Sequence, residues 1–253
     1  MTSLSVDELG IDFGGVRAVD GVSFSAPDAG VTAIIGPNGA GKTTLFNMIS
    51  GIYRPARGTV RLFGEDVTGE PPFRLAELGL SRTFQNLQIF FQMTALENVM
   101  VGNHLGESHN VLRHLLPLPS AFREDWRARE AARTELAHVG LEGIAKRVAG
   151  SLSYGELKRL EIARALAAKP RILLLDEPAA GCNAVETEAL SALIRRLAGE
   201  GLSIVLVEHD MAMVMSLADR VIVLDQGRLI ADGPPEAVRS DPSVRAAYLG
   251  AEV

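Results

Sequence analysis

The stretch that decides the fold is Gly36-Pro37-Asn38-Gly39-Ala40-Gly41-Lys42-Thr43. It fits the pattern G-x-x-x-x-G-K-[ST], directly after the apolar run 31–35 and before a helical run at 44–49. Glycines allow consecutive backbone N–H groups to turn inward around a phosphate, and the positive end of the following helix points to the same place. The sequence therefore predicts a loop that binds the phosphates of a nucleotide between a buried strand and a helix.

Two side chains of this loop have expected roles beyond those of the backbone. Lys42 supplies a full positive charge for the β- and γ-phosphates of a nucleoside triphosphate. The hydroxyl of Thr43 is placed to bind Mg²⁺. With the adjacent Thr44, the predicted nucleotide-binding residues of this segment are 36–44.

A pair of acidic residues follows a second apolar run. Asp176 and Glu177 come directly after residues 172–175, at the end of a predicted strand, where open parallel sheets bind their ligands. Asp176 is suited to hold Mg²⁺, directly or through water, and Glu177 to orient or deprotonate the water that attacks the γ-phosphate. A third apolar run ends before Glu208-His209-Asp210, so we expect His209 at the same edge and interpret it as a γ-phosphate sensor.

Composition limits the classes of function. The chain has 253 residues, of which 47% are hydrophobic, so it can form a sizeable core. A net charge of −6 gives no overall basic field, and we expect no nucleic-acid partner. The single cysteine, Cys182, cannot form an internal disulfide. No apolar run approaches the roughly 18 residues of a membrane span, so we expect other chains to do any crossing of a membrane.

Short apolar runs at both ends of the chain predict strands. The runs 22–24, 31–35 and 60–63 lie in the first third, and 172–175 and 204–207 flank a helical stretch in the βαβ rhythm of a parallel sheet. These patterns indicate an α/β or mixed sheet.

The C-terminal part of the chain is predicted to form a β-hairpin followed by a short helical segment. Residues 221–224 and 228–231 flank the turn Asp225-Gln226-Gly227, and 234–253 look like a short helical appendage.

The middle of the chain, 86–165, is predicted to be helical. One face of the predicted helix is formed by residues three or four positions apart, namely Phe122, Trp126, Arg129, Ala132, Leu136 and Val139. Charged residues fill the other face at Arg123, Glu124, Asp125, Arg127 and Glu130. We interpret the aromatic residues of this stripe as core packing rather than as a ligand site.

One segment of this helical region narrows the choice among nucleotide-binding proteins. Leu152-Ser153-Tyr154-Gly155-Glu156 resembles the LSGGQ signature of the ABC ATPase family. Other motifs of the family occur in the family's order along the chain. Phe13 resembles the adenine-stacking aromatic, Gln85 the Q-loop glutamine, Ala180-Gly181-Cys182-Asn183 the D-loop and His209 the switch histidine.

The resemblance implies an α/β fold with a P-loop ATPase core, an antiparallel β subdomain and an inserted α-helical subdomain. The single domain would span 1–253, with the core at 1–85 and 166–253 and the helical signature subdomain at 86–165. ATP and Mg²⁺ are the implied cofactors.

The resemblance also implies roles for individual residues. The implied catalytic residues are Glu177, His209 and Gln85. The implied Mg²⁺ ligands are Thr43, Gln85 and Asp176. The implied signature contacts to ATP bound by a partner subunit are Ser153, Tyr154, Gly155 and Glu156.

Within the family, five segments are similar to the ATP-binding subunits of branched-chain amino-acid importers: 82–86, 94–102, the polar insertion that follows, 159–164 and 247–250. This likeness implies a peripheral subunit on the cytoplasmic face of the cell membrane. Its implied partners are a second ABC ATPase, two integral-membrane permeases docked around 85–101 and, indirectly, a periplasmic or surface solute-binding protein. A heterodimer of ATPases is implied, with a homodimer as the alternative.

Three departures bear on the resemblance. Tyr154 replaces the second signature residue, as is usual in this branch. Glu156 and Leu157 stand where the branch usually has two glutamines, and Cys182 replaces a usual leucine. The substrate is inherited from the likeness alone, so urea, short amides and aromatic acids stay open beside branched-chain amino acids.

The alternatives are a soluble ABC ATPase acting on DNA or ribosomes, an iron–sulfur assembly ATPase, and a binding module with an inactive site. The intact Lys42, Asp176, Glu177 and His209 disfavour the inactive site.

Overall fold

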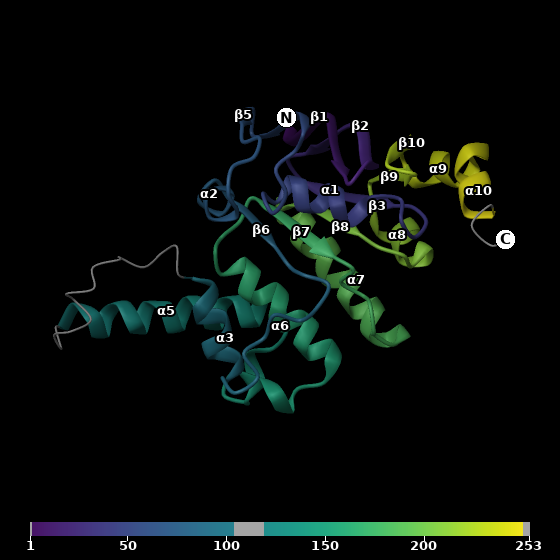
Figure 1. The fold of residues 1–253 in the computed structure, drawn as a ribbon. Coiled ribbons are helices and arrows are strands. Elements are labelled where there is room, and N and C mark those ends of the chain that lie inside the picture. Colours follow the sequence, from purple (N-terminus) through teal and green to yellow (C-terminus); the bar gives the residue numbers. More distant parts are fainter. Residues whose placement is uncertain (1, 104–118, 250–253) are drawn as a thin grey trace. The chain divides into compact units, whose positions relative to one another are not determined.

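The computed structural model describes residues 2–103 and 119–249 (Figure 1). The chain divides into two units, Met1–Gln85 with Arg171–Val253, and Asn86–Pro170. Each unit is built from different elements and has its own packing.

A six-stranded sheet forms the centre of the first unit. Its strand order is β10-β9-β3-β8-β7-β6, and all neighbouring pairs except β9 and β10 are parallel. The strands are β3 (Gly30–Ile35), β6 (Leu80–Arg82), β7 (Ile172–Asp176), β8 (Ser203–Val207), β9 (Arg220–Asp225) and β10 (Arg228–Gly233). Every residue of β7 and β8 is buried, as expected for parallel strands that are covered on both faces.

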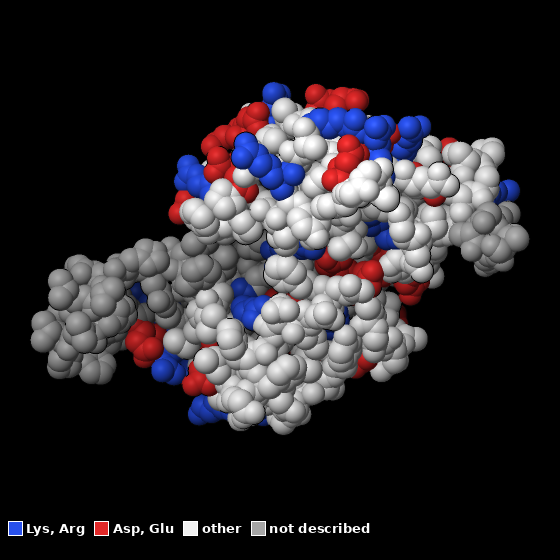
Figure 2. Space-filling model, viewed as in Figure 1, with Lys and Arg blue, Asp and Glu red and all other residues white. Residues whose placement is uncertain are grey.

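A second, antiparallel sheet has the order β2-β1-β4-β5. Its strands are β1 (Thr2–Phe13), β2 (Val16–Pro27), β4 (Arg57–Leu62) and β5 (Glu65–Asp66). Figure 2 shows acidic and basic side chains intermixed over this part of the surface. Asp20 on β2, for example, pairs with Arg17, Arg57 and Arg228.

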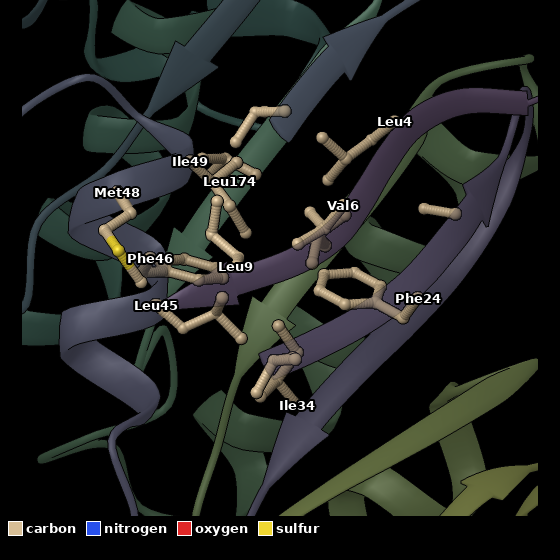
Figure 3. Packing of buried hydrophobic residues seen from close by; sticks show 14 of the residues in the cluster. Leu4, Val6, Leu9, Phe24, Ile34, Leu45, Phe46, Met48, Ile49 and Leu174 are labelled. Carbon is tan, nitrogen blue, oxygen red and sulfur yellow. The ribbon is translucent and has the colours of Figure 1, made fainter. Parts of the chain in front are cut away.

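The two sheets share a core with α1 (Lys42–Ile49). Leu4, Val6 and Leu9 of β1 pack with Leu45, Phe46 and Ile49 of α1 and with Ile34 and Leu174 of the central sheet (Figure 3). Burying a side chain of this size contributes about 1.5–3 kcal/mol. The core therefore fixes the start of α1 against the end of β3.

Further helices complete the first unit. They are α2 (Pro72–Glu77), α7 (Ala184–Gly199), α8 (Met211–Leu217), α9 (Pro235–Ser240) and α10 (Pro242–Leu249). Leu190, Leu193, Ile194 and Leu197 form the buried face of α7, which packs on β3 and β8. The predicted hairpin is confirmed: Gln226 and Gly227 have φ values of 46° and 79°, as a two-residue type I′ turn requires.

The second unit is helical, as predicted. It contains α3 (Ala95–Gly102), α5 (Pro119–His138), α6 (Tyr154–Leu166) and the short 3₁₀ turns η2 (Glu142–Ile144) and η3 (Ala149–Ser151). The buried Asn98 of α3 accepts a hydrogen bond from the Phe90 N–H and donates to the Phe90 and Thr94 carbonyls. It thereby ties the preceding loop to the helix.

The predicted core stripe of α5 is wrong at Trp126, which is 63% exposed, and at Arg129, which is also exposed. Ala132 and Leu136 of the predicted stripe are buried, and Ala128 is the further buried residue among the described side chains of this helix, so the buried positions are spaced four apart. Trp126 precedes Ala128 by two residues, about 200° around a helix, so it faces away from that stripe.

Several predicted features lie outside the described residues. They are the side chains of Phe122, Arg123 and Glu124, most of the polar insertion after Gly102, and Gly250 in the last branch-like segment. Within 2–103 and 119–249, no helix has both the length and the apolar character needed to cross a bilayer.

Candidate active site

The phosphate-binding loop connects β3 to α1, as its pattern predicted. A Cβ atom at Gly36 would lie 2.1 Å from the Leu224 carbonyl oxygen, and one at Gly41 would lie 2.5 Å from the Ala18 carbonyl oxygen. Both positions therefore require glycine because the backbone of another strand approaches closely. No acidic residue lies in the first turn of α1, so its N–H groups are available to an anion.

Lys42 is buried and folds back into the loop. Its Nζ donates to the carbonyl oxygens of Gly36 at 2.7 Å and Pro37 at 3.0 Å, which leaves one N–H donor for a phosphate. Burial lowers the pKa of Lys42 below its ordinary value, and the negative charge of Glu177 opposes that shift. The Thr43 side chain is exposed beside it.

Glu177, Gln85 and His209 converge after the ends of three neighbouring strands. Glu177 Oε2 accepts a hydrogen bond from Gln85 Nε2 at 2.8 Å, and Oε1 lies 2.7 Å from His209 Nε2. Glu177 has φ of 47°, a left-handed conformation that is uncommon for residues other than glycine. Such a backbone persists only where its surroundings impose it, and it is often found at functional sites.

Asp176 ends β7, directly before this group. Its side chain is buried, and its Oδ2 accepts a hydrogen bond from Arg82 Nη2 at 2.7 Å. Arg82 Nη1 also donates to Asn47 Oδ1 at 2.8 Å, and Asn47 lies one turn after Thr43 on α1. Arg82 therefore ties the Asp176 carboxylate to α1, the helix on which Thr43 lies.

These residues fit Mg²⁺. Among the described residues, no group of three or more acidic, histidine or cysteine side chains could hold a metal ion. Mg²⁺ does not need such a group, because it prefers oxygen ligands, keeps several waters and is held by one or two carboxylates plus substrate phosphates. An exposed hydroxyl at Thr43 and a carboxylate at Asp176 match this requirement.

Glu208 is a buried residue whose role the sequence did not indicate. Its Oε1 accepts a hydrogen bond from the Ala179 N–H at 2.8 Å, and its Oε2 accepts one from the His209 N–H at 2.9 Å. Asp210 caps α8 by accepting from the Met213 N–H at 3.0 Å. Glu208 and Asp210, the acidic residues on either side of His209, therefore orient the loop that carries this histidine.

Phe13 ends β1 and is 45% exposed. Its ring meets that of Tyr53 edge to face, with centroids 5.4 Å apart. Tyr53 carried no signal in the sequence, because aromatic residues after a helix are common in cores. An exposed ring supported from one side is suited to stacking on a base.

The signature segment begins α6 in the helical unit. The Ser153 side chain accepts a hydrogen bond from the Glu156 N–H, and the Glu156 carboxylate accepts one from the Ser153 N–H, which forms a capping box. Arg147 Nη1 lies 3.6 Å from Glu156 Oε1. Tyr154 is partly exposed and Gly155 is buried. Glu156 therefore supports the helix start.

The first unit therefore combines a loop suited to phosphates with a carboxylate close enough to influence Lys42. The loop N–H groups and Lys42 provide positive potential for phosphates. A carboxylate held from both sides, as Glu177 is, can accept a proton from water, which is the task of a general base.

Two family models match this chain. The model of the ABC transporter family matches residues 19–180. The model described as branched-chain amino acid ATP-binding cassette transporter matches residues 228–253.

Similar proteins cover nearly the full length. The chain is 47% identical over 248 residues to BraF of Pseudomonas aeruginosa, a high-affinity branched-chain amino acid transport ATP-binding protein, covering 98% of this chain and 97% of the relative. It is 43% identical, with the same coverage, to the protein of the same description from Escherichia coli K12, LivG.

Solved structures are similar as well. The ADP conformation of MJ1267, an ATP-binding cassette of an ABC transporter, has a TM-score of 0.86 and 35% identity, covering 99% of each chain. A nucleotide-free ATP-binding cassette from an ABC transporter has a TM-score of 0.85 and 34% identity, covering 98% of this chain and 99% of that one.

Proposed function

Because this chain belongs to the ABC transporter family, we propose that it binds and hydrolyses ATP to drive uptake of branched-chain amino acids through separate permease subunits. The observation that carries this proposal is the placement of Glu177, bonded to Gln85 and His209, next to the phosphate-binding loop. The relatives BraF and LivG support the choice of substrate.

In the proposed mechanism, residues 36–44 bind the phosphates and Phe13 stacks on the adenine. Lys42 stabilises negative charge on the β- and γ-phosphates. Mg²⁺, when bound by Thr43, Gln85 and Asp176, would offset further charge on the phosphate oxygens.

Glu177 acts as the general base in this mechanism. Its carboxylate takes a proton from the attacking water, and the hydrogen bond from Gln85 fixes the direction in which the carboxylate points. His209 holds the other carboxylate oxygen and reports the presence of the γ-phosphate. The positive φ of Glu177 aims its side chain in a direction that an ordinary strand end would not allow.

The proposed assembly contains two ATPases beneath two integral-membrane permeases. The whole chain acts as one ATPase domain, with 86–165 as its signature subdomain. Ser153, Tyr154, Gly155 and Glu156 contact ATP bound by the partner ATPase, so two nucleotides join a head-to-tail pair. ATP binding drives closure because ATP binds the closed pair more tightly than the open pair. The permeases dock around 85–101.

The proposed location is the cytoplasmic face of the cell membrane, where the permeases hold the chain as a peripheral subunit. A periplasmic or surface solute-binding protein delivers the substrate from the other side. A heterodimer of two ATPases is proposed from the likeness to the branched-chain importer branch and from Glu156 and Leu157 in the signature segment.

The experiment that tests the proposal is purification of the tagged chain from its own host with its membrane partners. The expected complex contains two permeases and a second, different ATPase. In vesicles with ATP inside and the binding protein outside, labelled leucine should accumulate. Preferred uptake of urea, a short amide or an aromatic acid would overturn the substrate, and a complex without permeases would overturn transport. Two copies of this chain and no other ATPase would overturn the heterodimer.

A further inference from the structure

Arg82, the last residue of β6, is a buried cation next to the proposed Mg²⁺ ligand. Its side chain is 7% exposed and that of Asp176 is 5% exposed, and their atoms Nη2 and Oδ2 lie 2.7 Å apart. Removing two charges from water costs free energy, and well-packed apolar residues at such a position often stabilise a fold to the same extent as a buried ion pair does. Folding alone therefore does not explain a charged residue at this position.

The guanidinium group is held from several sides. Nη1 donates to Asn47 Oδ1 at 2.8 Å and to Ser50 Oγ at 2.6 Å, at the C-terminal end of α1. The guanidinium carbon lies 5.4 Å from the centroid of the Phe46 ring and 5.1 Å from that of Phe84. Arg82 Nε is buried with no hydrogen-bond partner among the described residues, which adds to the cost of the arrangement.

The residue after Arg82 fixes the backbone of the same aspartate. Thr83 Oγ1 accepts from the Asp176 N–H at 3.4 Å, and the Thr83 N–H donates to the Leu174 carbonyl oxygen at 2.9 Å. The end of β6 thus holds both the main chain and the carboxylate of Asp176. Arg82 bonds Oδ2 and leaves Oδ1 for another ligand.

We propose that Arg82 is a positioning residue that orients the Asp176 carboxylate for the Mg²⁺ of MgATP by tying it to α1, the helix that carries Thr43. This inference rests on the proposed metal role of Asp176. Arg82 touches neither ATP nor the metal, so its removal affects the part of the ATP affinity that depends on Mg²⁺ and spares the metal-free part. Partners that orient metal ligands in this way are typically worth about 10- to 100-fold in metal affinity.

The test uses the full chain with Arg82→Met, which keeps the length of the side chain and removes its charge and donors. Equilibrium affinity for ATP is measured with excess Mg²⁺ and again with a chelator, and the ratio of the two dissociation constants gives the Mg²⁺-dependent gain. This gain should fall about tenfold or more, while the metal-free affinity stays within about twofold. The Mg²⁺ concentration at half-maximal turnover should rise with it.

Arg220→Met is the matched control. Arg220 makes a bidentate ion pair with Asp232 in the same unit, at 2.6 and 2.7 Å, and plays no part in the site. The control should keep the wild-type gain even if it lowers the melting temperature. Arg82→Lys keeps one charge for Asp176 but cannot reach Asn47 and Ser50 as a fork does, so it should recover part of the gain.

Asp176→Asn separates the two levels of the proposal. If Asp176→Asn loses the Mg²⁺-dependent gain and Arg82→Met keeps it, Arg82 has only a structural role and the inference is wrong. If Asp176→Asn keeps the gain, the proposed metal role of Asp176 is wrong and the inference falls with it. Should Arg82→Met fail to fold, Arg82→Gln, which keeps an N–H donor without the charge, gives the same decision.

Discussion

Gly36→Ala should destabilise the protein through a clash that the structure locates. A Cβ atom there would lie 2.1 Å from the Leu224 carbonyl oxygen and 3.1 Å from Ala40 Cβ, and the residue has φ of +152°. Leu224 belongs to β9, which pairs with both β3 and β10, so its carbonyl group can move only with the sheet. Overpacking costs about 1–3 kcal/mol and the unfavourable φ about 1–3 kcal/mol, which together give about 2–6 kcal/mol.

Two other glycines separate these contributions. Gly64 has φ of +86° and no atom within 4 Å of a new Cβ, so Gly64→Ala should cost only the conformational term of about 1–2 kcal/mol. Gly199 lies in α7 with neither a positive φ nor a close atom, so Gly199→Ala should stabilise by up to about 1 kcal/mol.

Urea unfolding of the three variants measures these differences directly. The predicted order of stability is Gly199→Ala above wild type, then Gly64→Ala, then Gly36→Ala. ATP affinity should fall only for Gly36→Ala, since only this residue lies in the phosphate-binding loop. A Gly36→Ala protein as stable as Gly64→Ala would refute the reasoning, because it would mean that the loop relaxes away from Leu224 at no cost.

Three further substitutions test other parts of the site. Phe13→Ala should weaken ATP binding about tenfold or more by calorimetry, since base stacking is worth about 1–3 kcal/mol; unchanged affinity would return Phe13 to a packing role with Tyr53. Lys42→Ala should lower both ATP affinity and turnover, because the charge acts on the bound phosphates and on the transition state; loss of turnover alone would contradict this. Glu156→Gln keeps the capping box with Ser153, so its unfolding free energy should stay within about 0.5 kcal/mol of wild type, and a larger loss would show that the charge itself is needed.

Local patterns in the sequence predicted much of the fold. The fold class and the family were predicted from short motifs and are confirmed by the similar structures and relatives. The hairpin was predictable because a two-residue turn ending in glycine has few geometries. The buried face of α5 was predicted only in part: Ala132 and Leu136 are buried, but Trp126 and Arg129 are not, since their spacing fits a helix equally well with either side buried.

The contacts of the candidate site could not be predicted, because they join distant parts of the chain. Gln85 is 92 positions from Glu177, and Arg82 is 94 positions from Asp176. The positive φ of Glu177 could not be predicted, because an acidic residue at the end of a strand does not indicate a left-handed backbone. Arg82 was recognised only as part of segment 82–86, which is similar to the branched-chain importer ATPases.

The most direct test of the account is the turnover and ATP affinity of Glu177→Gln in the transporter complex. Glutamine keeps the shape and a hydrogen-bonding oxygen but cannot take a proton from water. We expect turnover to fall about a hundredfold or more, while the ATP dissociation constant changes little and ATP-dependent pairing of the subunits persists. Turnover close to that of the wild type would contradict the assignment of Glu177 as the general base.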